Sequence, residues 1–168
     1  MEMLVDRGFP EIRKLSAEHW EAHADEEKNG PITAIYFIRG EKVGIDNMRD
    51  IKEAADKYHA IIIIYDDAIT PSAKVAITRK MQLFHVSELA FNITRHKLVP
   101  RHRLASPEET QAILRKFRVT REQLPRIPVT DPVIKYYGFP CDSLVIITRN
   151  FGVQIGVMEY PRVVVKNA

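Results

Sequence analysis

The sequence contains little of what would mark a secreted, disulfide-bonded or membrane protein. Its single cysteine, Cys141, excludes an internal disulfide and any zinc site built from several cysteines. The longest apolar run, residues 60–65, is far shorter than the roughly 20 residues of a membrane-spanning helix and is typical of a buried strand. Residues 1–10 include Glu2, Asp6 and Arg7 and no apolar segment of signal-peptide length, so we expect no secretion. These absences indicate a reducing compartment, the cytosol or the nucleus.

Signatures of catalysis and of cofactor binding are also scarce. The seven glycines are scattered, and Gly152 and Gly156 fall in a predicted hairpin, not between a strand and a helix where a phosphate-binding loop would lie. Cys141 lies in a predicted turn, and we interpret it as a lone structural thiol. His96 and His102 lack carboxylate or cysteine companions close in sequence, so they are interpreted as hydrogen-bonding residues that fix a loop. We therefore expect no metal site, no cofactor and no small-molecule substrate.

One pattern leaves an enzymatic alternative open. Asp66 and Asp67 follow the apolar run at 60–65, and Lys74 lies downstream. Acidic residues at a strand end together with a lysine are what an Mg²⁺-dependent nuclease would use to hold the metal and a phosphate. Here the two acids are sequence neighbours that point in opposite directions, and Lys74 falls in a predicted helix. Acids that merely end a strand explain the pattern more simply.

The charge of the chain is divided unevenly between its two halves. Residues 1–92 contain 12 Lys and Arg against 16 Asp and Glu, a net charge of −4. Residues 93–168 contain 13 against 6, a net charge of +7. A basic half is typical of proteins that bind nucleic acid or an acidic protein surface. The charge leaves open a free-standing DNA-binding module, a protein-docking module and a solvated basic face without a partner.

Residues 1–92 show the pattern of a small α/β domain, in which strands alternate with helices. The four consecutive isoleucines within 60–65 predict a strand at the centre of a sheet, covered on both faces. Asp46 and Thr70 are placed to cap helices, and Pro71 follows Thr70 where its missing N–H costs nothing. The expected elements are a loosely structured or helical opening to residue 28, a turn at 29–31, strands at 32–38 and 60–65, helices at 46–59 and 71–80, and a further strand at 88–93.

Residues 93–168 predict a second, α+β domain, with the boundary near 92–96. Ser106 and Glu109 form a capping box, with Pro107 at the first helical position. Asp131 followed by Pro132 predicts the start of a shorter helix. The expected elements are a helix from 107 to about 117, a single turn at 120–123, a short helix at 132–138, and strands at 144–148 and 157–165 around a loop from Gly152 to Gly156.

Histidines, prolines and arginines concentrate in three short segments, residues 96–102, 123–127 and 131–133. Prolines stiffen the backbone and so lower the entropic cost of docking. The alternative, a solvated helix face without a partner, does not account well for the arginines that lie between these prolines. No reaction chemistry requires this set of residues. We therefore interpret the segments as a rigid surface that docks on something larger.

The order and spacing of these motifs resemble those of one known family. The residues that carry the resemblance are His96, Leu98, Val99, Pro100 and His102, then Ser106 and Glu109, Gln123, Leu124, Pro125, Arg126 and Ile127, and finally Asp131, Pro132, Val133, Tyr136 and Gly138. Earlier matches are Asp6-Arg7-Gly8-Phe9, Ile69-Thr70-Pro71-Ser72-Ala73 and Asn92-Ile93-Thr94. Together they resemble the fifth subunit shared by the eukaryotic nuclear RNA polymerases, whose second domain has a counterpart in the archaeal polymerases.

The resemblance implies a non-catalytic structural subunit of a DNA-directed RNA polymerase that acts in transcription in the nucleus. It implies an α/β jaw domain, a small mixed sheet with helices, over residues 1–92 and beside the downstream DNA duplex. It implies an α+β assembly domain over residues 93–168 that docks on the largest subunit. The implied DNA-proximal residues are Thr70, Pro71, Ser72 and Lys74. The implied docking residues are His96, Leu98, Val99, Pro100, His102, Gln123, Leu124, Pro125, Arg126, Ile127, Asp131 and Pro132.

Overall fold

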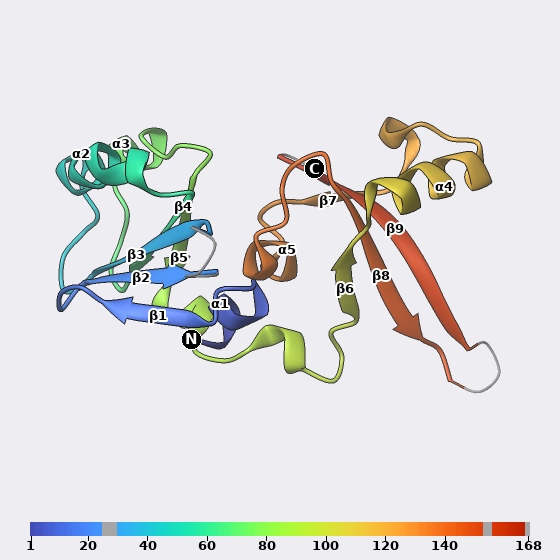
Figure 1. Ribbon diagram of the computed structural model, residues 1–168, viewed down its shortest axis with the longest axis horizontal. Helices are drawn as coiled ribbons and strands as arrows, with labels where there is room; N and C mark the ends of the chain where they lie inside the picture. Colours follow the sequence, from blue (N-terminus) through green and yellow to red (C-terminus); the bar gives the residue numbers. More distant parts are fainter. Residues whose placement is uncertain (25–29, 153–155, 167–168) are drawn as a thin grey trace. The chain divides into compact units, whose positions relative to one another are not determined.

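The computed structural model describes residues 1–24, 30–152 and 156–166, and the chain forms two compact units, Met1–Phe91 and Asn92–Ala168 (Figure 1). Each unit has its own sheet and its own hydrophobic core. The expected turn at 29–31 and the expected loop from Gly152 to Gly156 include residues that lie outside the described ones. Within the described ranges, no helix is long and apolar enough to cross a membrane.

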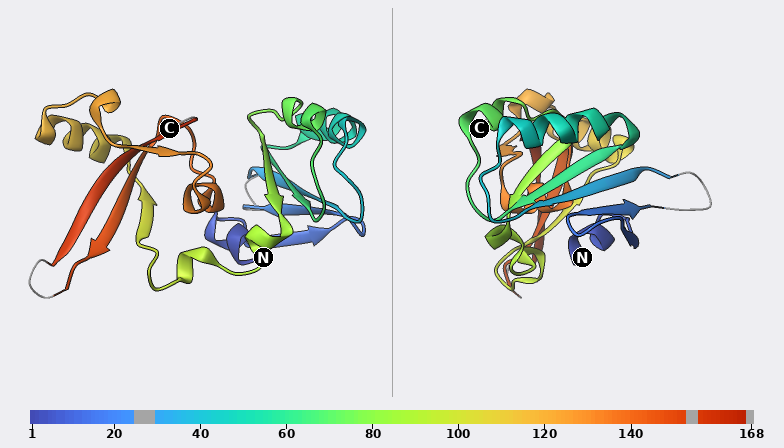
Figure 2. Two further views of the ribbon diagram at one scale, coloured as in Figure 1. Left: turned by 180° about the vertical axis from the view of Figure 1, so that it is seen from behind. Right: turned by 90° about the vertical axis from the view of Figure 1, so that its left-hand side faces the viewer.

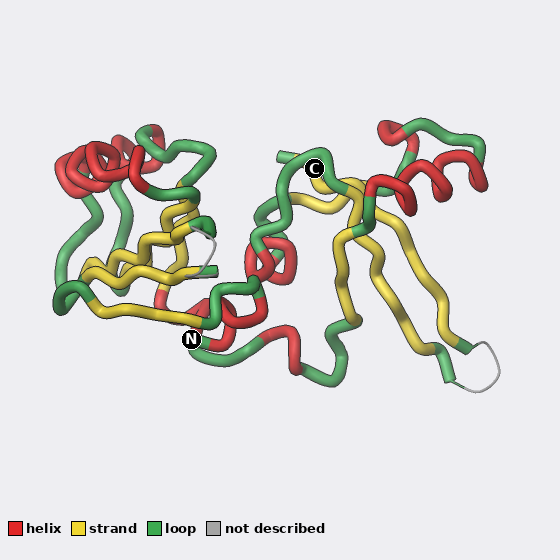
Figure 3. The backbone as a smooth tube through the Cα atoms, viewed as in Figure 1, coloured by secondary structure: helices red, strands yellow, loops and turns green. Residues whose placement is uncertain are grey.

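The first unit is built on a mixed sheet of five strands in the order β1-β2-β3-β4-β5 (Figure 3). The strands are β1 (Glu11–Lys14), β2 (His19–His23), β3 (Ile32–Ile38), β4 (Ala60–Tyr65) and β5 (Met81–His85). The first three pair antiparallel, whereas β3, β4 and β5 pair parallel. Helices α2 (Ile45–Ala54) and α3 (Pro71–Val75) connect the parallel strands, as expected for strands that alternate with helices.

The isoleucines of β4 form the centre of this unit, as predicted. Strand β4 lies between β3 and β5, and all four isoleucines from Ile61 to Ile64 are buried. Ile61 and Ile63 pack beneath α2 and α3 with Met48 and Val43. The other face is covered by α1 (Glu2–Asp6) (Figure 2). The guanidinium of Arg7, which follows α1, lies 5.9 Å from the centre of the Phe84 ring. Strand β4 is thus covered on both of its faces.

The prediction of a loosely structured or helical opening is wrong for residues 11–23, which form the antiparallel pair β1–β2. The alternation of side chains along β2 is the signal that was missed, because it has the period of a strand. Ala22 is completely buried, and the Trp20 ring meets the Phe37 ring of β3 edge to face, with 5.0 Å between ring centres. Among the described residues of the opening, 1–24, only residues 2–6 are helical.

Two predicted helices are shorter than expected, and one predicted strand is absent. Helix α2 ends at Ala54 and tightens into the 3₁₀ turn η1 (Ala55–Lys57). Helix α3 ends at Val75, and residues 76–80 lead from it into β5. The strand predicted at 88–93 is wrong, because 3₁₀ turns η2 (Val86–Leu89) and η3 (Ile93–Arg95) occupy that segment. The Glu88 carboxylate accepts the His85 N–H at 2.8 Å, a capping contact that favours a helical turn over a strand.

The second unit is built on a four-stranded sheet in the order β6-β8-β9-β7. The strands are β6 (Arg101–Leu104), β7 (Arg126–Pro128), β8 (Leu144–Asn150) and β9 (Val157–Val165). Strand β9 pairs antiparallel with β8 and parallel with β7, and β6 pairs antiparallel with β8. The two long strands were predicted and are confirmed. The short edge strands β6 and β7, which begin at the ends of the segments 96–102 and 123–127, were not predicted.

The helices of the second unit begin where their caps predicted. They are α4 (Pro107–Phe117), the 3₁₀ turn η4 (Arg121–Gln123) and α5 (Pro132–Tyr137). The Ser106 hydroxyl accepts the Glu109 N–H, and the Asp131 carboxylate accepts the Val133 and Ile134 N–H groups. Gly138 ends α5 with φ of 67°, a left-handed conformation that favours glycine.

Side chains from both faces of β8 hold this unit together. Val145 and Ile147 pack with Ile134 of α5, and Leu144 packs with Ile113 and Leu114 of α4. Residues Leu144 to Ile147 are all buried. The prediction that the chain combines a small mixed sheet with helices is therefore confirmed as a coarse α+β fold.

The burial of β4 predicts a large cost for truncating one of its side chains. Ile63 is fully buried, so Ile63→Ala should lower the free energy of unfolding by about 3 kcal/mol through lost burial and the cavity left behind. Val75→Ala, at a position 87% exposed, is the matched control and should change it by less than about 0.5 kcal/mol. Urea unfolding followed by the fluorescence of Trp20 measures both. Similar values for the two variants would contradict the assigned core.

Candidate functional site

The first predicted docking segment, 96–102, is a loop that leads into β6 and is held by its own hydrogen bonds. The His96 Nδ1 accepts the Leu98 N–H at 3.2 Å, and the His96 carbonyl accepts the Val99 N–H at 2.9 Å. The His102 Nδ1 donates to the Pro100 carbonyl at 2.8 Å. Both histidines thus fix a loop, as the sequence predicted. The loop leaves Leu98 83% exposed, which is unusual for a leucine.

The second segment, 123–127, alternates between side chains that build the fold and side chains that face water. Leu124 and Ile127 are buried in the two core clusters of the unit. The Gln123 side-chain carbonyl caps η4 by accepting the Thr120 N–H at 2.8 Å. Pro125 and Arg126 are exposed, and their backbone carbonyls accept hydrogen bonds from the Val163 N–H and the Arg162 guanidinium, respectively. Within residues 123–127, Pro125 and Arg126 are therefore the two whose side chains are exposed and neither cap a helix nor belong to the core.

The third segment has a mainly structural role. The Asp131 carboxylate is used as the cap of α5, at 2.9 Å from the Val133 nitrogen and 3.2 Å from the Ile134 nitrogen. Pro132 is the first residue of α5 and is exposed. A proline there lacks an N–H that the helix would leave unpaired in any case. Asp131 thus positions α5, and Pro132 is the member of this pair that a partner can reach.

The structure does not bring the three segments together into one patch. The order β6-β8-β9-β7 places β6 and β7 at opposite edges of the sheet. The segment 96–102 precedes and enters β6, whereas 123–127 enters β7 and 131–132 follows it. The docking residues predicted at 96–102 and those predicted at 123–127 therefore lie at opposite edges of the sheet, with the core strands between them.

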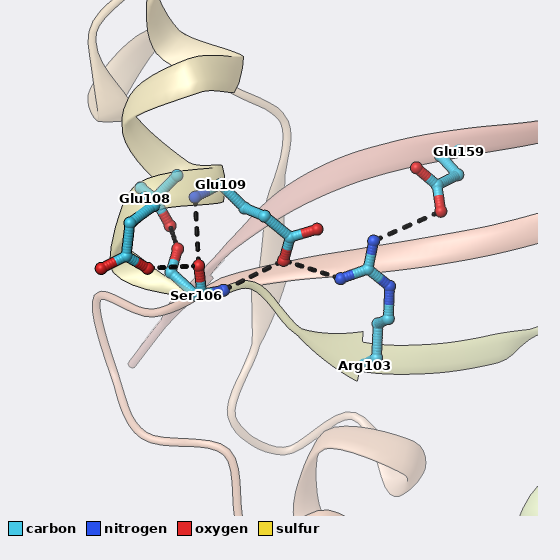
Figure 4. Close-up of polar contacts among 6 residues, drawn as sticks. Arg103, Ser106, Glu108, Glu109 and Glu159 are labelled. Carbon is cyan, nitrogen blue, oxygen red and sulfur yellow. Dashed lines mark hydrogen bonds and ion pairs between the residues drawn. The ribbon is translucent and has the colours of Figure 1, made fainter.

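A charged network beside β6 was not predicted from the sequence (Figure 4). The Arg103 guanidinium contacts the Glu109 carboxylate at 2.8 Å and the Glu159 carboxylate at 3.4 Å, and so joins β6 to α4 and β9. The hydrogen bond from Arg103 lowers the pKa of Glu109, and the hydrogen bond from the Ser106 hydroxyl lowers the pKa of Glu108. The capping box was visible in the sequence, but Glu159 is 56 residues from Arg103, so no local signal revealed the network.

The predicted DNA-proximal residues lie around the start of α3. The Thr70 hydroxyl accepts the Ala73 N–H at 3.3 Å and donates to the Val43 carbonyl at 3.1 Å, so it is occupied by the fold. Pro71, Ser72 and Lys74 are exposed. Thr70 thus holds the turn, and the side chains that remain available to a partner are those of Ser72 and Lys74.

The geometry around Asp66 supports its simpler interpretation. Its carboxylate accepts the Gly40 N–H at 3.0 and 3.3 Å, which ties the loop after β4 to the loop after β3. Gly40 has φ of 71°, so this turn favours glycine. Across the described residues, no group of three or more His, Cys, Asp or Glu side chains is arranged to hold a metal ion. Asp66 is a loop-fixing residue.

The sequence of this chain is similar to those of known proteins. Residues 91–164 match the family model described as RNA polymerase Rpb5, C-terminal domain. The chain is 36% identical over 135 residues to DNA-directed RNA polymerases I, II, and III subunit rpabc1 of Dictyostelium discoideum, covering 73% of this chain and 68% of the relative. It is 31% identical over 169 residues to DNA-directed RNA polymerase subunit 5-like protein 1 of Arabidopsis thaliana, covering 95% and 80%. A third relative, DNA-directed RNA polymerases IV and V subunit 5B of Arabidopsis thaliana, is 27% identical and covers 88% and 78%.

The cap of α4 predicts a measurable loss of stability. Ser106→Ala removes the acceptor for the Glu109 N–H and should destabilise the second unit by about 1 kcal/mol. Gln111→Ala, at an exposed position of the same helix, is the control and should change stability by less than about 0.5 kcal/mol. Hydrogen exchange of the β8 amides reports on this unit. Equal protection in the two variants would show that the cap does not matter.

The Arg103–Glu109 pair predicts a dependence of stability on pH. Because the hydrogen bond from Arg103 lowers the pKa of Glu109, folding favours the charged carboxylate. Its contribution is present above the ordinary pKa of 4.5 and is lost as the pH falls through the lowered value of the folded state. Glu109→Gln should therefore be less stable than wild type at neutral pH and should approach wild type in acid. Arg103→Gln should cause a similar loss, and the double variant little more. If Glu109→Gln lowered the free energy of unfolding equally at neutral pH and in acid, the result would contradict the pairing.

Proposed function

Because the chain belongs to the Rpb5 family of DNA-directed RNA polymerase subunits, we propose that it is a non-catalytic structural subunit of a multisubunit DNA-dependent RNA polymerase. The observation that carries this proposal is the alignment with a subunit-5-like protein over 95% of the chain, which includes both units. It is accordingly an accessory subunit of an enzyme complex and works without a cofactor of its own. The relatives are named as subunits of DNA-directed RNA polymerases I, II and III or IV and V, and we infer that this chain acts in the nucleus.

The second unit is the part that docks on the largest polymerase subunit. The family model matches residues 91–164, which is nearly all of this unit. Its sheet ends in two short edge strands, and the exposed docking residues lie beside them. The prolines and internal hydrogen bonds of these segments hold them in one conformation before binding, which lowers the entropic cost of assembly.

The first unit is a jaw that lies beside downstream duplex DNA in the assembled enzyme. The exposed Ser72 and Lys74 at the start of α3 are the residues that contact the phosphate backbone. A hydroxyl and an ammonium bind phosphate without reading the base sequence, as a subunit that meets every transcribed gene requires. The net charge of −4 over residues 1–92 makes strong binding by the isolated chain unfavourable. The contact therefore depends on the rest of the enzyme holding the duplex in place.

The docking role predicts a specific loss of assembly. The tagged chain should co-purify with the largest and second-largest polymerase subunits. The double variant Pro125→Gly, Arg126→Glu should retain about tenfold less of both, since it changes two exposed side chains but keeps the carbonyls that pair with Val163 and Arg162. Arg115→Glu, a charge reversal on the exposed surface of α4, is the control and should assemble normally. Normal assembly of the double variant would count against docking through β7.

The jaw role predicts a position-dependent contact with DNA. A photoreactive group at Ser72 should crosslink to downstream duplex in the assembled enzyme on a DNA template. The same group at Glu11, exposed on the edge strand β1, is the control and should crosslink much less. Lys74→Glu should reduce the yield from Ser72 because it replaces an attractive charge with a repulsive one. Equal yields from Ser72 and Glu11 would contradict a DNA-facing turn.

A further inference from the structure

The edge of the second sheet formed by β6 carries unused backbone hydrogen-bonding groups. The Ala105 N–H donates to the Leu144 carbonyl at 2.9 Å, in register with the pairs Arg103–Ile146 and Arg101–Thr148. In an antiparallel pair the intervening residues turn their N–H and C=O groups away from the partner strand. His102 and Leu104 therefore present their backbone groups at the free edge of β6. None of the hydrogen bonds found within the described residues uses these groups.

The chain segment that contains this edge is basic in sequence. Residues 93–105 contain three Lys and Arg besides Arg103, or four in all, and no Asp or Glu. Arg103 is neutralised by Glu109 and Glu159. Lys97 and Arg101 are exposed, and neither has a carboxylate partner in the described part of the chain. An unpaired charge next to open backbone groups attracts a segment of opposite sign.

We propose that the free edge of β6 receives an extended acidic segment of a partner polymerase subunit, which adds to the sheet as a further strand. This inference rests on the proposed function and specifies the chemistry of the docking partner. The backbone groups of His102 and Leu104 pair with the added strand, as in other cases of strand addition. An acidic side chain of that strand lies beside Arg101, and a neighbouring one reaches Lys97. The 83% exposed Leu98 gives the segment an apolar contact at the end of the edge.

A nucleic acid fits this edge less well than a peptide. Residues 93–105 contain no Phe, Tyr or Trp on which bases could stack, and stacking supplies much of the affinity for single strands. A sheet edge offers donors and acceptors in alternation, which matches a peptide backbone but not a row of phosphate acceptors. Charged residues also protect edge strands from aggregation. The experiment must therefore distinguish binding of a partner strand from a purely protective role of these charges.

Two pairs of full-length variants test the strand addition and the charge separately. Leu104→Pro removes an N–H that points to the free edge and leaves the pairing with β8 intact, whereas Leu104→Ala shortens the same side chain and keeps the N–H. Lys97→Glu, Arg101→Glu reverses the charge at the edge. Arg115→Glu, Lys116→Glu reverses two exposed charges on α4 as the control. Hydrogen exchange of the β8 amides shows that each variant is folded.

The readout is the amount of largest polymerase subunit that each tagged variant retains from a nuclear extract. Leu104→Pro and the Lys97, Arg101 reversal should each retain about tenfold less than wild type, and the two controls should stay within about twofold.

If Leu104→Pro does not fold, the charge reversal decides alone. Retention of the polymerase by folded variants of both kinds overturns the inference and leaves the proposed function standing. Loss of duplex DNA binding without loss of assembly overturns it in favour of a nucleic-acid partner. Failure of wild type to retain any polymerase subunit overturns the proposed function and this inference together.

Discussion

Burial of one central strand on both of its faces is the constraint on which each unit depends. In the first unit the strand is β4, with Ile61 to Ile64, and in the second it is β8, with Leu144 to Ile147. Each such side chain contributes about 1.5–3 kcal/mol when it leaves water. Because a strand that is buried on both faces must have neighbours on both sides, the short and charged strands are left at the edges. The residues available to partners therefore lie at sheet edges and at the turns that begin helices.

Proline-backed caps place those edges and turns. Thr70, Ser106 and Asp131 each accept a backbone N–H at the start of a helix and are each followed by a proline. Helices as short as α3 and α5 are not stable alone, so capping and packing determine where they begin. In the second unit, Arg103 adds a charged link between β6, α4 and β9. The edges that we propose for docking are therefore held in place by contacts within the chain itself.

The parts of the fold that could be predicted from the sequence are those with local signals. The isoleucines of β4 and the caps at Ser106 and Asp131 depend on neighbouring residues, and their elements begin where expected. The edge strands β6 and β7 were missed because their partners, such as Thr148 for Arg101, are distant in sequence. The β1–β2 pair is local, and it was missed because the alternation of side chains along β2 was not recognised as that of a strand. The motif residues of the candidate site could be identified from the sequence. The sequence did not reveal that Leu124 and Ile127 belong to the core, or that β6 and β7 lie on opposite edges of the sheet.

The chain belongs to a family of polymerase subunits, and in the role we propose its second unit carries the assembly surface and its first unit meets the duplex only within the complex. Crosslinking mass spectrometry of the complex isolated through this chain tests that account most directly. Crosslinks from Lys97 and Lys135 of the second unit should concentrate on the largest polymerase subunit, whereas Lys52 of α2 should give few. Crosslinks to that subunit only from the first unit, or an absence of polymerase peptides from the isolated complex, would contradict it.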